Sequence, residues 1–189
     1  MIHKFCYFDG KIIPIDKARI GLDDLGILRG YGAFDFSRTY NGKLFHIKDQ
    51  FARFKNSTKS IGLSVPVSQS SFEEILYKLL KKNKLKDASF RAVVTGGPSS
   101  SDMISGNKPI FYILVEPAYS LPSSFYKNGV KLILHEYMRY VPQAKTTNYI
   151  EAARLQKEKK RQKAFEILYT SDNKIFECSS SNFFLIKNN

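Results

Sequence analysis

Residues 142–149 read PQAKTTNY and place one basic residue, Lys145, among small and polar neighbours. This stretch lies between a predicted strand at 130–140 and a predicted helix at 149–163, for which Asn148 is a suitable N-cap residue. A lysine that forms a Schiff base needs such a place, because its amine must be deprotonated near neutral pH and held rigidly. A solvated loop lysine is the alternative interpretation, since most lysine side chains in proteins are exposed.

A second informative stretch, at residues 175–186, reads IFECSSSNFFLI. A carboxylate, Glu177, is followed by small hydroxyl residues and then by an apolar segment at 182–186 that is predicted to be a strand. A carboxylate that faces the nitrogen of a pyridine ring keeps this nitrogen protonated and makes the ring an electron sink. A serine-rich turn with an exposed glutamate is the alternative interpretation.

Turn signals and amphipathic patterns elsewhere in the chain predict an α+β fold. Asp9-Gly10 and Asn41-Gly42 are two-residue hairpin signals, each between two apolar segments. Apolar periodicity predicts a helix at 50–61, and capping boxes that begin at Ser70 and Ser71 predict a second helix. The sequence therefore indicates an antiparallel sheet near the N-terminus with two amphipathic helices.

The order of the predicted elements indicates two domains. We expect a small α+β domain, an α/β sandwich, at 1–115, and a proline-containing linker at 116–125. The part at 126–189 is expected to be the beginning of a second, β-rich domain. The sequence ends directly after the apolar segment at 182–186, which fits either a naturally short protein or a truncated chain.

The composition excludes several classes of protein. No apolar run approaches the roughly 20 residues of a membrane span, so no membrane partner is predicted. Cys6 and Cys178 lack metal-ligand spacing, so no metal site is predicted, and so few cysteines fit a cytoplasmic protein. A net charge of +13 is also found in proteins that bind nucleic acid. Its excess lies partly in charge blocks typical of solvated helix ends, and no nucleic-acid-binding motif accompanies them, so no nucleic-acid partner is predicted.

Together, the two quoted stretches resemble the signature of the class IV (fold-type IV) enzymes that depend on pyridoxal 5′-phosphate. The resemblance rests on Lys-x-x-Asn at 145–148, followed by Glu-x-Ser-x-Ser-Asn-Phe at 177–183. Segments of the N-terminal half follow the same family order, with FDGKIIP at 8–14, YNGKLF at 40–45 and QFARF at 50–54. The family includes branched-chain aminotransferases, D-amino-acid aminotransferases and aminodeoxychorismate lyases. The resemblance implies that residues 126–189 are the N-terminal part of a larger, barrel-like domain that binds the cofactor.

The resemblance implies cofactor-binding roles for individual residues of this chain. Lys145 matches the lysine that carries the cofactor as an internal aldimine, and Glu177 matches the partner of the pyridine nitrogen. Arg53 matches the arginine that binds the cofactor phosphate, a role suited to a bidentate guanidinium. Tyr149 matches the tyrosine that, in the branched-chain enzymes, hydrogen-bonds the phenolic oxygen of the cofactor. Further residues that match the lining of the cofactor pocket are Ser180, Ser181 and Asn182.

The resemblance also indicates a substrate side in the first domain. Phe34 and Arg91 match substrate-side positions of the branched-chain enzymes, and Arg29 falls where their pattern has a tyrosine. The D-amino-acid enzymes have a tyrosine at the position of Phe34 and an arginine in the loop held here by residues 95–97. This chain lacks both, so the branched-chain pattern is favoured.

Three hypotheses for the function follow. The first is an aminotransferase that moves an amino group between a branched-chain-like amino acid and a 2-oxo acid, as a cytoplasmic homodimer. The second is a lyase of the aminodeoxychorismate type, which would release pyruvate without an oxo-acid acceptor. The third is a truncated, non-catalytic relative that serves as a binding or dimerisation module, because family members continue beyond the residues matched here.

Overall fold

The computed structural model describes residues 4–101, 104–106 and 108–187, and the chain divides into two compact units. The first unit comprises Met1–Tyr119 with Gln143–Asn148, and the second comprises Ser120–Pro142 with Tyr149–Asn189. The segment that contains Lys145 therefore belongs to the first unit, although the chain on both sides of it belongs to the second. The predicted α+β fold class is confirmed.

A six-stranded antiparallel sheet forms the centre of the first unit, in the order β2-β1-β8-β5-β3-β4. Its strands are β1 (Phe5–Phe8), β2 (Lys11–Pro14), β3 (Gly32–Tyr40), β4 (Lys43–Leu44), β5 (Ala88–Thr95) and β8 (Phe111–Pro117). Both predicted hairpins are confirmed. The turn residues Asp9, Gly10, Asn41 and Gly42 all have positive φ, which matches the twist of a tight hairpin.

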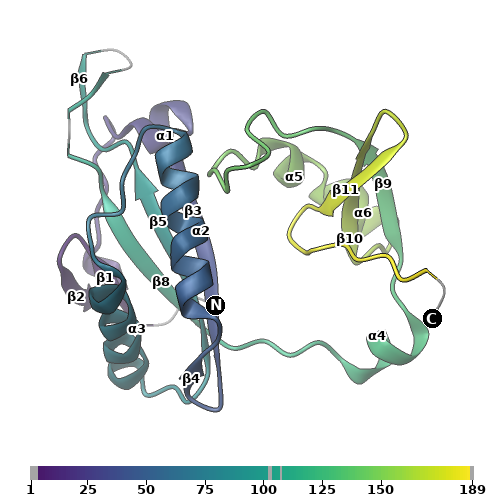
Figure 1. Ribbon diagram of the computed structural model, residues 1–189, viewed down its shortest axis with the longest axis horizontal. Helices are drawn as coiled ribbons and strands as arrows, with labels where there is room; N and C mark the ends of the chain where they lie inside the picture. Colours follow the sequence, from purple (N-terminus) through teal and green to yellow (C-terminus); the bar gives the residue numbers. More distant parts are fainter. Residues whose placement is uncertain (1–3, 102–103, 107, 188–189) are drawn as a thin grey trace. The chain divides into compact units, whose positions relative to one another are not determined.

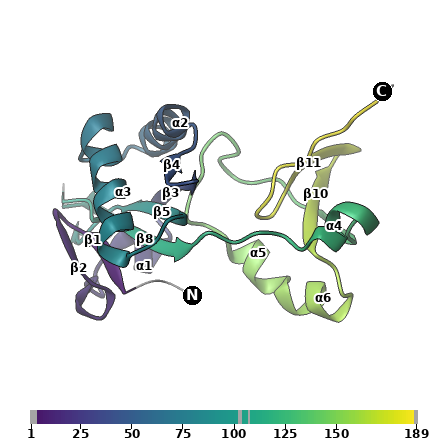
Figure 2. The ribbon, with the colours of Figure 1, turned by 90° about the horizontal axis from the view of Figure 1, so that it is seen from below.

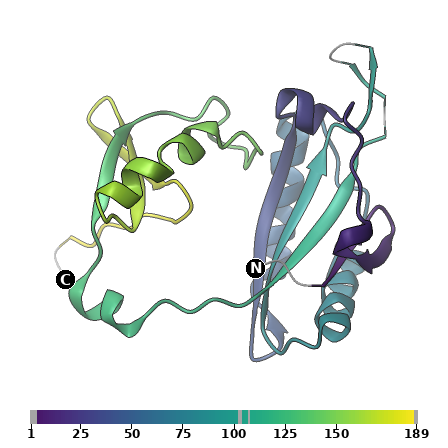
Figure 3. The same cartoon turned by 180° about the vertical axis from the view of Figure 1, so that it is seen from behind.

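Two amphipathic helices, α2 (Ile47–Ser60) and α3 (Gln69–Asn83), cover one face of this sheet (Figures 1 and 2). Seen from behind, the strands lie in front of the two helices (Figure 3). The predicted start of α3 was too late, because Ser68 is the N-cap residue and its side chain accepts a hydrogen bond from the amide of Ser71. Shorter elements of this unit are η1 (Ile15–Lys17), α1 (Leu25–Arg29), β6 (Ser99–Ser101) and β7 (Ile104–Ser105).

The core of the first unit lies between the sheet and the two helices. It is built largely from aromatic rings, and Phe54 and Phe111 are both fully buried, with ring centroids 6.4 Å apart. Other buried members are Phe51, Phe72, Leu76, Leu79, Phe90, Val94, Ile113 and Val115. This core fixes α2 on the sheet, and α2 in turn carries Arg53 and Ser57 of the candidate site.

The second unit contains a smaller sheet of three strands, in the order β11-β10-β9. Its elements are α4 (Ser123–Asn128), β9 (Leu132–Glu136), α5 (Ile150–Arg154), α6 (Gln156–Arg161), β10 (Glu166–Ser171) and β11 (Lys174–Cys178). Strands β9 and β10 are parallel, and α5 and α6 lie on one side of the sheet (Figure 2). A small core of Ile133, Ile167 and Tyr169 packs against Leu155 between these helices and the sheet.

Two local predictions for the second unit are wrong. The helix predicted at 149–163 is interrupted at Leu155, and its cap residue is Tyr149 rather than Asn148, because Asn148 belongs to the segment that packs with the first unit. The segment at 182–186 forms no strand, since a strand needs a hydrogen-bonded neighbour and the described residues provide none beside it. None of the helices in the described part of the chain has the length and apolarity of a membrane span.

Candidate functional site

Lys145 lies in a short extended segment that pairs with the edge of β3. The amide of Phe34 donates to the carbonyl of Lys145 at 2.9 Å, and the amide of Thr147 donates to the carbonyl of Gly32, also at 2.9 Å. The amide of Lys145 donates to the hydroxyl oxygen of Ser57 on α2 at 3.1 Å. Hydrogen bonds to two different elements therefore fix the main chain of Lys145, which meets the requirement that a Schiff-base lysine be held rigidly.

The side chain of Lys145 is half-buried against the first unit. Its ammonium nitrogen lies 4.9 Å from the ring centroid of Phe34, within the range of a cation–π contact. The close approach of the segment depends on Gly32, because a Cβ atom there would lie 2.8 Å from the carbonyl oxygen of Val94 and 3.1 Å from Oγ1 of Thr147. The glycine that opens β3 therefore makes room for the lysine segment.

Arg53 is held by a buried carboxylate, Asp35. Its Nε and Nη2 atoms donate to the two Asp35 oxygens at 2.8 and 2.7 Å. The Asp35 side chain is 5% exposed, whereas that of Arg53 is 53% exposed. A bidentate pair of this kind fixes the plane of a guanidinium, so Arg53 is oriented while half of its side chain remains accessible.

The three predicted substrate-side residues occupy different places in the first unit. Arg91 on β5 lies opposite Phe36 on β3, so Phe34, Phe36 and Arg91 project from the same face of the sheet. Arg29 lies in the last turn of α1, is exposed, and donates from Nη1 to the carbonyl of Leu28 at 3.0 Å. The structure therefore brings Phe34 together with Lys145 and places Arg91 on the face that bears Phe34.

In the second unit, Glu177 is held by an arginine that sequence analysis did not single out. Nη1 of Arg139 lies 3.1 Å from Oε1 of Glu177. The guanidinium of Arg139 also lies 5.0 Å from the ring centroid of Tyr149, and its Nη2 donates to the carbonyl of Ser179 at 3.3 Å. Arg139 thus connects Glu177 and Tyr149, both of which were predicted to bind the cofactor.

A cavity of about 320 Å³ lies beside this arginine. It is lined by Tyr137, Met138, Arg139, Pro142, Tyr169, Phe176 and Glu177. Burial raises the pKa of Tyr169 to about 12, although the charge of Arg139 acts in the opposite direction. The cavity combines aromatic walls with one carboxylate and one guanidinium, a composition that suits a planar, charged ligand.

The serine run that follows Glu177 folds around a second carboxylate, that of Glu166. The hydroxyls of Ser179, Ser180 and Ser181 all donate to Glu166, and so does the amide of Ile167 at 2.9 Å. Glu166 is 3% exposed. The hydroxyls of the predicted cofactor-lining residues Ser180 and Ser181 are therefore directed at this carboxylate, whereas Asn182 is exposed in the irregular segment that follows.

The serine cluster determines the charge state of Glu166. Burial alone would raise the pKa of this carboxyl group, but the hydrogen bonds from Ser179, Ser180, the Ile167 amide and Ser181 outweigh it, so the pKa is lowered. A buried carboxylate is tolerated when several donors satisfy it. Glu166 therefore anchors the turn that follows Glu177 as an ionised group.

Sequence analysis missed both Arg139 and Glu166, although each left a signal. Arg139 continues the alternation of inward positions that begins at Ile133 on β9. Glu166 stands between Phe165 and the apolar residues of β10. A charged residue at an inward position of a strand is costly unless it has partners.

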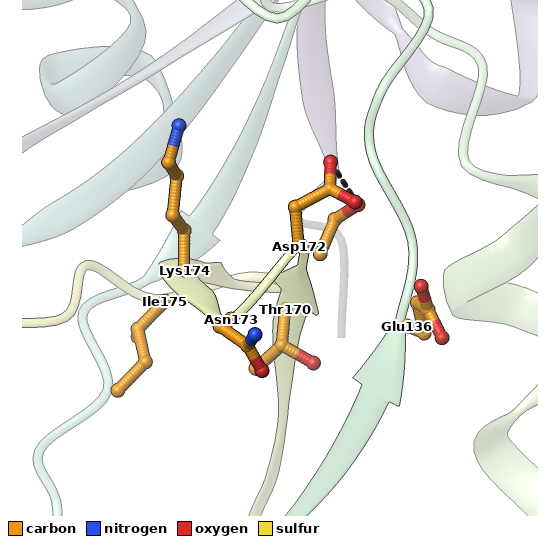
Figure 4. A pocket seen from close by; sticks show the side chains of 7 residues that line it. Glu136, Thr170, Asp172, Asn173, Lys174 and Ile175 are labelled. Atoms are coloured by element: carbon orange, nitrogen blue, oxygen red, sulfur yellow. Dashed lines mark hydrogen bonds between the residues drawn. The ribbon is translucent and has the colours of Figure 1, made fainter.

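Two further cavities are lined by none of the predicted site residues. One, of about 420 Å³, lies beside the turn between β10 and β11. Its lining includes Glu136, Asp172 and Lys174 (Figure 4). Another, of about 390 Å³, lies between α2 and the segment that precedes α3. Across the described residues, no group of three or more His, Cys, Asp or Glu side chains is arranged to hold a metal ion.

Curated proteins similar to this chain are aminotransferases. A D-alanine aminotransferase of Staphylococcus epidermidis is 24% identical, and a provisionally named branched-chain-amino-acid aminotransferase of Methanocaldococcus jannaschii is 27% identical. Each match covers 96% of this chain and 65% of the relative. The chain thus spans just under two thirds of the length of these relatives.

Solved structures support the fold. The branched-chain aminotransferase of the archaeon Thermoproteus uzoniensis, solved with norvaline, matches 94% of this chain and 63% of that protein, with a TM-score of 0.80 at 22% identity. A provisionally named aminotransferase of Mycobacterium tuberculosis, solved with pyridoxal phosphate bound, matches 93% of this chain and 65% of that protein, with a TM-score of 0.74 at 19% identity. The family described as amino-transferase class IV matches residues 32–189, which is most of the sequence. This chain therefore belongs to the class IV aminotransferase family.

Proposed function

We propose that this protein takes part in amino-group transfer between an amino acid and a 2-oxo acid, with pyridoxal 5′-phosphate as its cofactor and Lys145 as the lysine that binds it. The observation that carries this proposal is the fixed main chain of Lys145, held by hydrogen bonds from Phe34 and to Ser57. The class IV family and the cofactor bound in the Mycobacterium tuberculosis structure give it independent support.

Taken separately, residues of each unit have the chemistry that this cofactor needs. A pyridine ring requires a carboxylate near its nitrogen and flat apolar surroundings, and Glu177 lies beside a cavity walled by aromatic rings. A phosphate requires an oriented cation, and Asp35 orients the guanidinium of Arg53. We assign Glu177 to the ring nitrogen, Arg53 to the phosphate and Tyr149 to the phenolic oxygen. The proposed remaining contacts come from Ser180, Ser181 and Asn182.

Bound pyridoxal phosphate supplies an electron sink for the negative charge that develops at Cα of the amino acid. Lys145 then has two tasks: its amine holds the cofactor, and, once the substrate amine has displaced it, Nζ takes the proton from Cα. Glu177 holds a proton at the ring nitrogen, which strengthens the electron sink. Phe34, in contact with Lys145, helps to exclude water from this amine.

For the substrate, we propose a branched-chain-like amino acid. Phe34 and Arg91 share one face of the sheet and offer an apolar wall with a cation for the substrate carboxylate, and we keep Arg29 as a third substrate-side residue. Relatives named for D-alanine give the competing possibility. A comparison of L-leucine with D-alanine as amino donor, with 2-oxoglutarate as acceptor, distinguishes the two. The proposal predicts faster turnover of L-leucine, and a preference for D-alanine would contradict it.

The experiment that tests the function compares two lysine variants. Wild-type protein is titrated with pyridoxal phosphate, and the absorbance band of a protonated Schiff base is recorded. Lys145→Ala should lose this band and all amino transfer, whereas Lys174→Ala, at the unrelated polar cavity, should keep both. If the Lys145→Ala variant kept the band, the assignment of Lys145 would be wrong.

Two broader proposals rest on the family resemblance. We propose that the protein forms a homodimer, which sedimentation velocity of the purified protein would test. We also propose a cytoplasmic location, which the two cysteines support because Cys6 and Cys178 are both buried free thiols.

A further inference from the structure

Arg139 occupies a position that neither the motif nor the proposed chemistry explains. It follows β9 by three residues, on the side of the chain that bears Ile133 and Tyr137, and its side chain is only 18% exposed. A guanidinium remains charged at all physiological pH values, so burying it requires partners. Its partners are Glu177, the carbonyl of Ser179 and the ring of Tyr149.

The contrast between Arg139 and Glu177 shows which of the two is the fixed partner. Glu177 is 47% exposed, and a glutamate with this much freedom populates several rotamers. Arg139 has two contacts besides Glu177, because the ring of Tyr149 lies against its guanidinium and the Ser179 carbonyl accepts from Nη2. The ion pair therefore restricts Glu177 through a side chain that is already immobile.

We infer that Arg139 is a positioning residue, which acts on the ring nitrogen of the cofactor through Glu177. The ion pair uses Oε1 of Glu177, and we assign Oε2 to the ring nitrogen. This inference rests on the proposed function. It adds that the strength of the contact between Glu177 and the ring nitrogen depends on a second residue.

The test compares pyridoxal phosphate with its 1-deaza analogue, in which carbon replaces the ring nitrogen. Dissociation constants of both are measured for the wild type, Arg139→Met and Glu177→Gln, and the ratio of the two constants reports the contact at the ring nitrogen alone. A general loss of structure weakens the binding of both compounds and leaves the ratio of their dissociation constants unchanged. Arg139→Met keeps an apolar stem. Arg154→Met is the control, because Arg154 is exposed and pairs with Glu151, and neither residue lines the cavity beside Glu177.

We expect Arg139→Met to reduce the preference for pyridoxal phosphate over the analogue at least tenfold, as Glu177→Gln does. In the Glu177→Gln background, Arg139→Met should change the preference less than twofold, because the two residues act in series. Arg154→Met should leave it unchanged. Arg139→Lys, the milder substitution, should give an intermediate preference, because lysine keeps the charge but not the planar fork.

An unchanged preference in both Arg139 variants would overturn the inference, as would full additivity with Glu177→Gln. Failure of the proposed function has a different signature. In that case, wild-type protein would give no Schiff-base band with pyridoxal phosphate, whatever residue stands at position 139.

Discussion

The two units of this protein hold their site residues by different means. The first unit fixes Lys145 through main-chain hydrogen bonds to a wide sheet, over a thick core of phenylalanine and aliphatic side chains. The second unit has a three-stranded sheet and a small core, and it holds Glu177 and the serine turn through Arg139 and Glu166. Apolar packing is the main support in the first unit, and hydrogen-bonded or ion-paired charged groups are the main support in the second.

This difference indicates where each unit tolerates change. A substitution in an apolar core lowers stability mainly through the side-chain volume that it removes. In a network of charged groups, the loss of any single partner lowers stability. The second unit also leaves large apolar side chains exposed, among them Leu134 and Phe184, the latter at 82%. Polar contacts therefore contribute a larger share of the stability of the second unit.

The largest effect is expected in the core of the first unit. Phe54→Ala removes a fully buried ring and should lower the free energy of unfolding of this unit by about 3–5 kcal/mol. Hydrogen–deuterium exchange of peptides that cover β5 measures it, because exchange resolves the two units. The matched control is Phe184→Ala, for which we expect less than about 0.5 kcal/mol. Equal effects of the two substitutions would contradict the described core.

The next effect tests the charge network of the second unit. Glu166→Ala leaves the buried Ser179 hydroxyl and the Ile167 amide without their acceptor, so we expect a loss of about 3 kcal/mol. Faster exchange in β10, with little change in β5, is the expected signature. Glu158→Ala removes a partly exposed carboxylate that pairs with the exposed Arg161 and should leave exchange nearly unchanged. Exchange in β10 at the wild-type rate in Glu166→Ala would rule out the anchoring role.

The ionised state of Glu166 also predicts how the stability of the second unit depends on pH. Because the pKa of Glu166 is lowered in the folded state, the unfolded chain takes up a proton first as the pH falls. The stabilisation by ionised Glu166 is therefore complete above the ordinary glutamate pKa of about 4.3 and is lost as the pH falls through the lower folded-state value. The stability gap between wild type and Glu166→Gln, which cannot titrate, should narrow on acidification. A gap that is constant with pH would contradict ionised Glu166.

The smallest effect concerns the side-chain contact that helps to hold Lys145. Ser57→Ala removes the acceptor of the Lys145 amide and should lower the stability of the first unit by about 1 kcal/mol. It should also weaken pyridoxal phosphate binding slightly, because the lysine segment keeps its pairing with β3. Ser60→Ala, on the same helix, serves as the control for binding. Equal cofactor affinities in both variants would mean that α2 does not help to place the lysine.

The sequence predicted features that depend on local chemistry. Both hairpin turns of the first unit were correct, because Asp-Gly and Asn-Gly readily adopt the positive φ that these turns require. The start of α3 was misplaced because several serines compete to cap it, and Ser68 does so in the structure. Residues 182–186 looked like a strand from their apolar character, but strand formation depends on a neighbouring strand.

The candidate site was predictable only in part. Lys145 and Glu177 were predicted as site residues because they stand in motifs, whereas the residues that hold them are distant in the sequence. Ser57 lies on α2, far along the chain from the lysine amide whose hydrogen bond it accepts, and Arg139 meets Glu177 only after the sheet has formed. Such long-range polar contacts follow from tertiary packing, which no local pattern encodes.

The central claim, that Lys145 binds the cofactor, has one direct test. Wild-type protein is mixed with pyridoxal 5′-phosphate, reduced with borohydride and digested, and the modified peptide is identified by mass spectrometry. We predict a single phosphopyridoxyl group on Lys145, with the other lysines, including Lys174 at the polar cavity, unmodified at stoichiometric cofactor. Modification spread over surface lysines, or concentrated on a lysine other than Lys145, would contradict the account.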